Sequence, residues 1–476
     1  MDKKVSTLLM HLPINLYDVR DYDVIIQPYG LAAISAYLKR YGYDVIFKDA
    51  HAYHMSRERI LQFVKESNPT IIGLPIFTSQ LPQTISFLKD VKSILPGIIS
   101  VVGGPHASEE YRSLLEHNGQ EIDIVVIGEG EYTMREIIDC IQNDRSLEGV
   151  KGIAYKSQEG VRVNPFREYI HDLDSLPYAD WDALPMKEYW GVWTERKNFV
   201  NIVFSRGCPF LCTFCGAKKA LGRVHRRRSP ANVIEELRFL YEKHRMRDIG
   251  LSDSTFNVDN EWVSQICEGI LKMGRRDLVW GCNLRLDKLD RATLKLMKRS
   301  GCTKVFIGVE SGDDVMLKAM KKGTNIGMVR DGVRMLEEIG FLVFCGFIVG
   351  MPGETEETIK KTMALAKQLR KHSCAFSLAT PFPGTEFAKT AEMEGFKVDD
   401  WSKHDTYGLT YIPKGMTREE LQNAYNIIVR NNYLSFAFLY RQVMQMRSWL
   451  QFKQTLRLGL RIIFGRLKRV KSMART

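Results

Sequence analysis

Three cysteines carry the chemistry that the sequence suggests first. Cys208, Cys212 and Cys215 are spaced C-x3-C-x2-C, and no fourth cysteine follows nearby. Thiolates in such a run hold a [4Fe-4S] cluster, and three of them leave the fourth iron open to a ligand that does not come from the protein. An open iron on a low-potential cluster is what is needed to bind S-adenosylmethionine (SAM) and cleave it reductively. The spacing therefore predicts a [4Fe-4S] cluster with SAM as its outer ligand.

A structural zinc site is the alternative interpretation of the same cysteines, with His225 as the fourth ligand. Zinc sites usually combine two pairs of ligands, each pair close in sequence. A lone run of three cysteines matches that pattern poorly, so the iron–sulfur interpretation is preferred.

The composition describes a large globular protein. The chain has 476 residues, 45% hydrophobic and 26% charged, which predicts two or three domains. No signal peptide and no long apolar stretch is apparent, so we expect a cytoplasmic location. The other six of the nine cysteines are expected to be core residues of a reducing compartment: Cys140, Cys267, Cys282, Cys302, Cys345 and Cys374.

The elements that must position the cysteines form two α/β series. In residues 1–145, apolar runs alternate with amphipathic stretches such as 31–41, 57–66 and 82–95, which predicts a flavodoxin-like, doubly wound domain. Its expected parallel strands are 7–12, 44–47, 70–77, 98–102 and 122–127. Residues 146–195 are rich in proline and turn residues and are expected to be a linker.

Residues 196–390 repeat strand and helix six times, which predicts a partial (βα)6 barrel with its chemistry at the carboxyl ends of the strands. Cys208 follows the first of these strands, as that arrangement requires. Residues 391–476 turn helical, with Thr417–Glu420 as a capping box. The expected barrel strands are 199–205, 248–252, 278–284, 304–310, 341–349 and 374–380.

Motifs at successive ends of these strands, together with the cysteines, resemble the radical SAM superfamily. They are Ser252–Phe256, Cys282–Asp287, Gly308–Gly312, Gly346–Glu354 and Thr380–Thr385. Taken singly, Glu310 could be a carboxylate paired with a lysine, and Gly350–Gly353 could be only a turn. The resemblance implies SAM contacts by Phe214, Asp253, Arg285, Glu310, Ser311, Ile348, Gly350 and Pro352. At the second strand many members have Gly-Gly-Glu where this chain has Ser252-Asp253-Ser254.

The fusion of a flavodoxin-like domain to this core resembles the cobalamin-binding radical SAM family over residues 5–390. The runs that carry the resemblance are 27–32, 49–51, 73–79, 103–106 and 128–131. It implies a cobalamin site at the strand ends, built by His51, Thr78, Ser79, Gly103, Gly104, Gly128 and Glu129. The Asp-x-His-x-x-Gly pattern is only half kept, since His54 replaces the glycine. His51 is therefore either a cobalt ligand or a loop histidine, and the whole domain is either a cobalamin site or retained for packing.

Basic residues gather in two places. The run Arg223–Arg228 is either a solvated face or the source of an arginine that reaches a cofactor phosphate or a substrate carboxylate near the barrel mouth. Residues 421–476 have 11 of the 68 Lys and Arg and no acidic residue, which leaves 57 basic against 56 acidic residues elsewhere. The stretch 449–464 combines a cationic and an apolar helical face, typical of an interfacial membrane helix. A core-packed helix with a solvated end is the alternative, and nucleic-acid binding ranks last.

The family resemblance implies an enzyme that cleaves SAM to a 5'-deoxyadenosyl radical and methylates an unactivated carbon. The alternative within the family is a non-methylating oxidative cyclase like the anaerobic magnesium-protoporphyrin IX monomethyl ester cyclase. A cobalamin or redox sensor and a tRNA methylthiotransferase are weaker hypotheses. We expect a small-molecule or lipid-like substrate, an external electron donor of the flavodoxin or ferredoxin type, peripheral membrane contact through the tail, and no nucleic acid.

Overall fold

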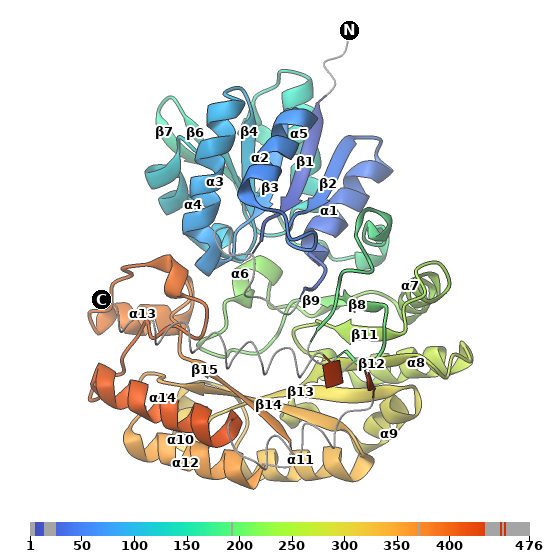
Figure 1. Ribbon diagram of the computed structural model, residues 1–476, viewed down its shortest axis with the longest axis vertical. Helices are drawn as coiled ribbons and strands as arrows, with labels where there is room; N and C mark the ends of the chain where they lie inside the picture. The colour runs from blue at the N-terminus through green and yellow to red at the C-terminus, as the bar shows by residue number, and fades with distance from the viewer. Residues whose placement is uncertain are drawn as a thin grey trace.

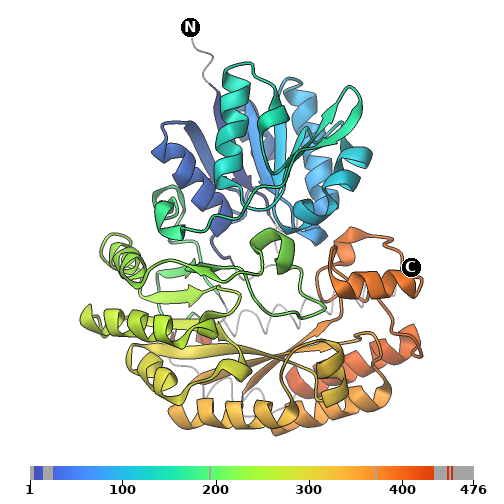
Figure 2. The same cartoon turned by 180° about the vertical axis from the view of Figure 1, so that it is seen from behind.

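The computed structural model describes residues 5–13, 25–191, 194–369 and 372–433, together with residues 448, 449, 452 and 453. Figure 1 shows two α/β bodies, one above the other. Between them lie a short helix, α6 (Ala217–Leu221), and the loop before it, which carries the three cysteines and is called the cluster loop. Figure 2 gives the same arrangement from behind.

The first body is a seven-stranded sheet in the order β2-β1-β3-β4-β5-β6-β7. Strands β1 to β5 are parallel, and β6 and β7 extend the sheet as an antiparallel hairpin. The strand order reverses between β1 and β3, which makes that point the switch point of the sheet. The strands are β1 (Ser6–His11), β2 (Asp44–Asp49), β3 (Ile71–Pro75), β4 (Ile99–Gly103), β5 (Ile124–Val126), β6 (Ile153–Ser157) and β7 (Gly160–Val163).

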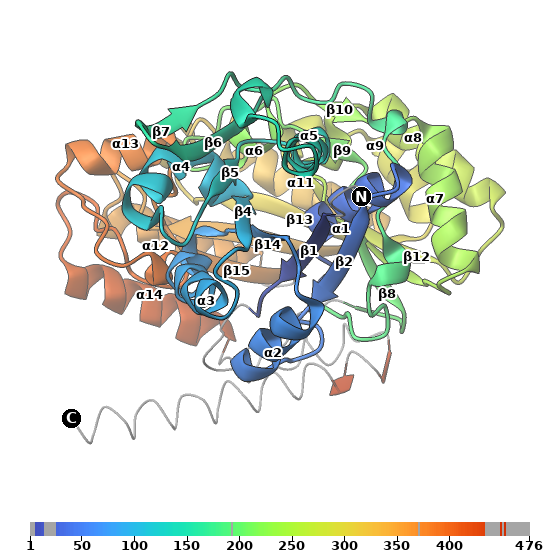
Figure 3. The same ribbon diagram turned by 90° about the horizontal axis from the view of Figure 1, so that it is seen from above.

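Five helices cover the two faces of this sheet, as parallel strands require. The helices α1 and α5 pack on one face and α2, α3 and α4 on the other, each over its own apolar cluster. Seen from above in Figure 3, the sheet lies over the second body. The helices are α1 (Tyr29–Arg40), α2 (Arg57–Ser67), α3 (Leu81–Ile94), α4 (Pro105–Asn118) and α5 (Glu131–Gln142).

The second body is an open barrel of six parallel strands in the order β15-β14-β13-β12-β11-β8. It confirms the predicted six strand–helix units, whose strands lie within one to three residues of the expected ranges. The strands are β8 (Phe199–Ile202), β11 (Asp248–Leu251), β12 (Val279–Leu284), β13 (Cys302–Glu310), β14 (Leu342–Val349) and β15 (Ser373–Leu378), and β9 (Ser205–Arg206) pairs with β10 (Arg226–Arg227) beside them.

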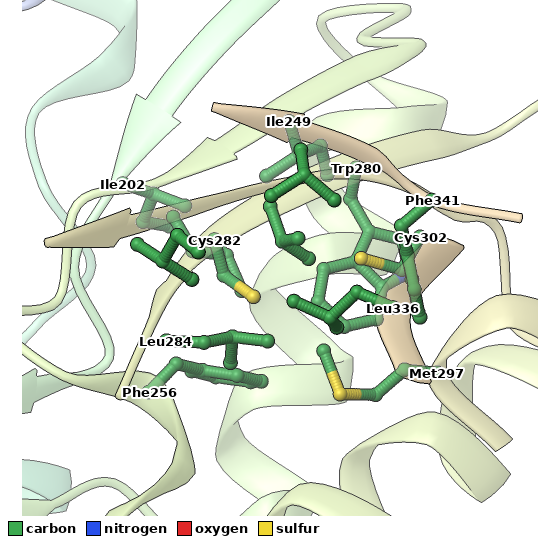
Figure 4. Packing of buried hydrophobic residues seen from close by; sticks show 14 of the residues in the cluster. Ile202, Ile249, Phe256, Trp280, Cys282, Leu284, Met297, Cys302, Leu336 and Phe341 are labelled. Carbon is green, nitrogen blue, oxygen red and sulfur yellow. The ribbon is translucent and has the colours of Figure 1, made fainter. Parts of the chain in front are cut away.

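Helices cover the outside of the barrel and bury one large apolar core against it. Figure 4 shows part of that core, where Trp280, Cys282 and Cys302 pack against Met297 and Leu336 of the outer helices. Cys282 and Cys302 are about 1% exposed or less, so they are core residues as expected. The helices of the second body are α7 (Pro230–Glu242), α8 (Asn260–Lys272), α9 (Arg291–Arg299), α10 (Asp314–Ala319), α11 (Ile326–Ile339), α12 (Glu356–Gln368), α13 (Glu386–Met393) and α14 (Arg418–Tyr433). Of these, α10 and α13 pack on a separate, smaller apolar cluster.

Local sequence signals explain where two of these helices begin. Ser229 accepts a hydrogen bond from the Asn232 amide ahead of α7, with Pro230 in the first turn. Thr417 and Glu420 exchange hydrogen bonds as a capping box at the start of α14.

The structure departs from the sequence prediction after residue 145. The hairpin β6–β7 continues the first sheet as far as Val163, so the turn-rich composition of this segment hid two strands. Most of the predicted membrane-binding stretch 449–464 lies outside the described residues. Within the part of the chain that the structure describes, no helix has the length and apolar character needed to cross a membrane.

Candidate active site

The cluster loop, which carries Cys208, Cys212 and Cys215, begins directly after β9, the short strand beside the barrel. Gly207 has a φ of +88°, and a Cβ there would lie 2.1 Å from the Val224 carbonyl oxygen, so only glycine fits. The Cys208 amide donates to the Gly222 carbonyl at 3.2 Å, and the Thr213 amide donates to the Met320 carbonyl at 3.1 Å. These bonds tie the loop both to the end of α6 and to the end of α10.

The three cysteines are free thiols gathered by this loop. Burial raises the pKa of Cys215, and the nearby Cys208 and Cys212 thiols raise it further. Cys208 Sγ lies 3.9 Å from the Thr255 hydroxyl, and Arg285 Nη1 donates to Cys212 Sγ at 3.7 Å. Hydrogen bonds to the sulfurs are a general feature of iron–sulfur sites, so this donor set fits a [4Fe-4S] cluster.

The zinc interpretation would need His225 beside these thiols. His225 instead packs edge-on against Trp262 of α8, with ring centroids 6.2 Å apart. Among the described residues no three His, Cys, Asp or Glu side chains converge as ligands of a single ion. The cysteines are therefore not arranged as a preformed single-metal site.

Arg285 and Glu310, two of the expected SAM contacts, meet beside the cluster loop through Lys322. Arg285 pairs with Asp287 at 2.9 Å, donates to the Lys322 carbonyl at 2.5 Å and stacks 3.6 Å over the Phe210 ring. Glu310 is held at φ +68° and accepts from Lys322 Nζ at 2.6 Å. The sequence analysis allowed that Glu310 is paired with a lysine, but it did not identify Lys322 as that lysine.

Asp253 and Ser311 are buried within the protein. Asp253 is 0% exposed and accepts hydrogen bonds from the Phe204 amide and from the Ser205 amide and hydroxyl. Burial raises the pKa of Asp253 to about 6. Ser311 contacts the Thr362 hydroxyl of α12 at 3.3 Å. Both side chains fix strand ends next to the cluster loop, and their direct contact with SAM stays a prediction.

The end of β14 forms a tight loop whose backbone is held by Glu354. Gly350 has a φ of +94°, and its amide and that of Met351 donate to Glu354 Oε2 at 2.5 and 3.3 Å. Burial raises the pKa of Glu354 to about 7. Phe214 and Ile348 both pack on the apolar cluster that contains Met351, so the loop carrying Pro352 lies beside the cluster loop. Contact of this loop with the adenine of SAM stays a prediction.

The expected cobalamin residues line the carboxyl edge of the first sheet. Gly104 has a φ of +95°, and a Cβ there would lie 3.2 Å from the Ile76 carbonyl. A Cβ at Gly103 would make only ordinary contact, 3.6 Å from Val126, and one at Gly128 would meet open space. Gly104 must therefore be glycine, whereas a Cβ at Gly103 or Gly128 would meet no close contact.

Other expected contacts of the first body are already engaged within the protein. The Thr78 hydroxyl lies 3.3 Å from His106 Nδ1, and Ser79 stands next to it in a short 3-10 turn. Asp49, the acid of the Asp-x-His pattern, contacts His11, Tyr189 and the Ala52 amide. His51 is 7% exposed and lies edge-on to His11, with ring centroids 5.5 Å apart.

Glu129 joins the two bodies. Its carboxylate accepts from Arg206 Nη1 and Arg226 Nη1, each at 2.9 Å, and from the Ile170 amide at 2.6 Å. Arg206 also pairs with Glu131 at 2.6 Å, and all four side chains are 11% exposed or less. We call Glu129, Glu131, Arg206 and Arg226 the interdomain ion cluster.

The basic run 223–228 therefore has neither of the expected roles at its buried positions. Arg226 and Arg228 are 5% and 3% exposed, and Arg228 donates to the Pro177 carbonyl at 3.0 Å and to Asn232 at 2.8 Å. They bind the linker and the first body instead of solvent. A charged run in sequence does not reveal which of its members a distant segment covers.

Two family models match the chain: the Radical SAM superfamily over residues 202–366 and the B12 binding domain over residues 18–138. A methyltransferase of Pyrococcus horikoshii, itself uncharacterized, is 31% identical over 410 residues, or 86% of this chain and 87% of that protein. The anaerobic magnesium-protoporphyrin IX monomethyl ester cyclase of Rubrivivax gelatinosus is 30% identical over 424 residues, or 87% and 74%.

One solved structure extends the comparison to the fold. The radical S-adenosylmethionine methyltransferase TsrM of Kitasatospora setae, with cobalamin and a [4Fe-4S] cluster bound, superposes with a TM-score of 0.71 at 18% identity. The match covers 90% of this chain and 92% of that one.

The barrel and its cysteine loop define a radical SAM enzyme. With the B12 binding domain ahead of them, the chain belongs to the cobalamin-binding radical SAM family. Its cofactors are a [4Fe-4S] cluster, SAM and cobalamin, and the free thiols of the cluster loop, with Arg285 donating to one of them, fit the first.

Proposed function

We propose that this enzyme methylates an unactivated carbon of a hydrophobic small molecule. The observation that carries the proposal is the interdomain ion cluster, which ties the Gly128–Glu131 loop to the strands flanking the cluster loop. Transfer of a methyl group to a carbon radical needs both cofactors to face one substrate at a fixed separation. A buried connection between their two loops supplies that fixed relation.

The bound groups would supply a hydrogen-abstracting 5'-deoxyadenosyl radical and a transferable methyl group. The protein's own contribution is position and exclusion of water. Arg285, which donates to Cys212 Sγ, offers a cationic group beside the cluster for the carboxylate end of SAM, and Glu354 fixes the backbone of the loop that would face a nucleobase. The apolar cluster around Phe214 and Met351 packs beside this region.

Product analysis after anaerobic reconstitution tests the proposal. With cobalamin, SAM, a reductant and candidate substrates, methyl transfer yields both S-adenosylhomocysteine and 5'-deoxyadenosine. The Cys212→Ala variant is expected to lose 5'-deoxyadenosine and the cluster absorbance, whereas the matched Cys267→Ala variant, changed in the core, keeps both. Formation of 5'-deoxyadenosine without any S-adenosylhomocysteine would contradict methyl transfer.

Oxidative cyclisation is the second candidate, favoured by the similarity to the magnesium-protoporphyrin ester cyclase over most of both chains. It uses the same cluster, SAM and cobalamin sites but transfers no methyl group, so the methyl group stays on the methionine released when SAM is cleaved. The product pattern named above separates it from methyl transfer.

The charge distribution supports a membrane-associated substrate. The catalytic body is nearly neutral, while residues 421–476 hold 11 basic and no acidic residues. A polybasic amphipathic tail is attracted to anionic lipid surfaces. We therefore favour a lipid-like substrate taken at the inner face of a membrane, with reducing equivalents from an external flavodoxin or ferredoxin.

A further inference from the structure

His11 ends the central strand β1 of the first sheet, where the strand order reverses. β1 pairs in parallel with β2 on one side and β3 on the other, and the connections β1–α1–β2 and β2–α2–β3 run over opposite faces. Ligands of doubly wound sheets bind beyond the carboxyl ends of the strands at this reversal. His51 instead follows β2, which is the edge strand.

The carboxylate of Asp49 orients the His11 ring. Asp49 Oδ1 lies 3.0 Å from His11 Nδ1, and the two residues are direct neighbours in the β1–β2 register. In the tautomer whose Nδ1 hydrogen points at Asp49 Oδ1, the lone pair of the neutral imidazole is on Nε2.

Tyr189, which comes from the linker segment, adds a second hydrogen bond to Asp49. Its hydroxyl donates to Asp49 Oδ2 at 2.6 Å, and its side chain is 3% exposed. Burial and the Asp49 charge raise the pKa of Tyr189, so the hydroxyl stays a donor. A histidine that donates one ring nitrogen to a buried carboxylate is the usual arrangement of a metal-ligating histidine, because the carboxylate fixes the tautomer and strengthens the other nitrogen as a donor.

We propose that His11, oriented by Asp49 and Tyr189, is the histidine that binds the lower face of the cobalt through Nε2. His51 is then a packing neighbour of His11. This inference rests on the cobalamin domain alone and not on methyl transfer, so it stands or falls apart from the proposed reaction.

Electron paramagnetic resonance of cob(II)alamin bound to the full-length protein tests the assignment. A nitrogen ligand splits the cobalt lines into three for ¹⁴N and two for ¹⁵N. Protein labelled with ¹⁵N-histidine and loaded with unlabelled cobalamin therefore separates a protein histidine, which gives pairs of lines, from the cofactor's own base, which gives triplets. We expect pairs of lines for the wild type and for His51→Ala, and none for His11→Ala.

A conservative variant tests the orienting role. Asp49→Asn keeps the size of the side chain but removes the charge, and it is expected to lower the affinity of His11 for cobalt by about 10–100-fold, seen as a mixed spectrum with the pairs of lines reduced. Triplets or unsplit lines from the labelled wild type would overturn the proposal. So would loss of the paired lines in His51→Ala, a result that does not depend on whether His11→Ala folds.

Discussion

The interdomain ion cluster gives the sharpest test of how the two bodies are held together. Glu129 is 5% exposed and neutralises Arg206 and Arg226, which are 11% and 3% exposed. Glu129→Ala leaves Arg226 without its carboxylate and Arg206 with Glu131 alone. Removing one partner from a buried ion pair costs about 3–5 kcal/mol, because a charge is left desolvated and uncompensated.

Thermal unfolding of the protein without cobalamin measures this cost. A loss of about 3–5 kcal/mol corresponds to a fall of about 6–20 °C in the melting temperature, at about 2–4 °C per kcal/mol for domains of this size. The matched control is Glu148→Ala, which breaks the solvent-exposed pair with Arg162, 56% and 48% exposed. That change is expected to cost about 1 kcal/mol or less.

The absence of cobalamin in this measurement separates two roles of Glu129. A residue that only contacts the cofactor would leave the cobalamin-free protein as stable as the wild type. Equal melting temperatures for Glu129→Ala and Glu148→Ala would therefore refute a stabilising role of the interdomain ion cluster. Glu129 would then keep only the cofactor contact that the sequence suggested.

Three further predictions concern the cluster, the SAM loop and the tail. Arg285→Lys removes the N–H···S bond to Cys212 and should lower the cluster's midpoint potential by about 60 mV, the equivalent of about 1.4 kcal/mol for one electron, in a redox titration; an unchanged potential contradicts it. Burial raises the pKa of Glu354 to about 7 from 4.5, so its neutral form favours folding and that contribution is lost as pH rises through this range. Glu354→Gln should therefore flatten the stability profile between pH 5 and 8 and exceed the wild type at pH 8, and parallel profiles would show that the carboxyl does not titrate there. Truncation after Arg447 should abolish sedimentation with anionic liposomes, because each basic residue removed takes away about 1 kcal/mol of binding free energy. Equal sedimentation of the truncated and full-length proteins would show that the tail does not bind lipid.

The sequence by itself determined the chemistry of the second body. The cysteine run and each strand-end motif are only a few residues long. Local spacing along a strand and its loop survives any arrangement of the rest of the chain. The same holds for the capping signals at Ser229 and Thr417, which the structure confirms.

Tertiary structure decided the partners of the charged residues. Glu129 meets Arg226 across 97 positions, and Asp49 meets His11 across 38 and Tyr189 across 140. No periodicity records such pairings, so the sequence assigned Glu129 to the cofactor and paired Asp49 with His51. A buried carboxylate is stabilised only by the donors that the fold brings to it, and which donors those are follows from the packing of two sheets and a linker.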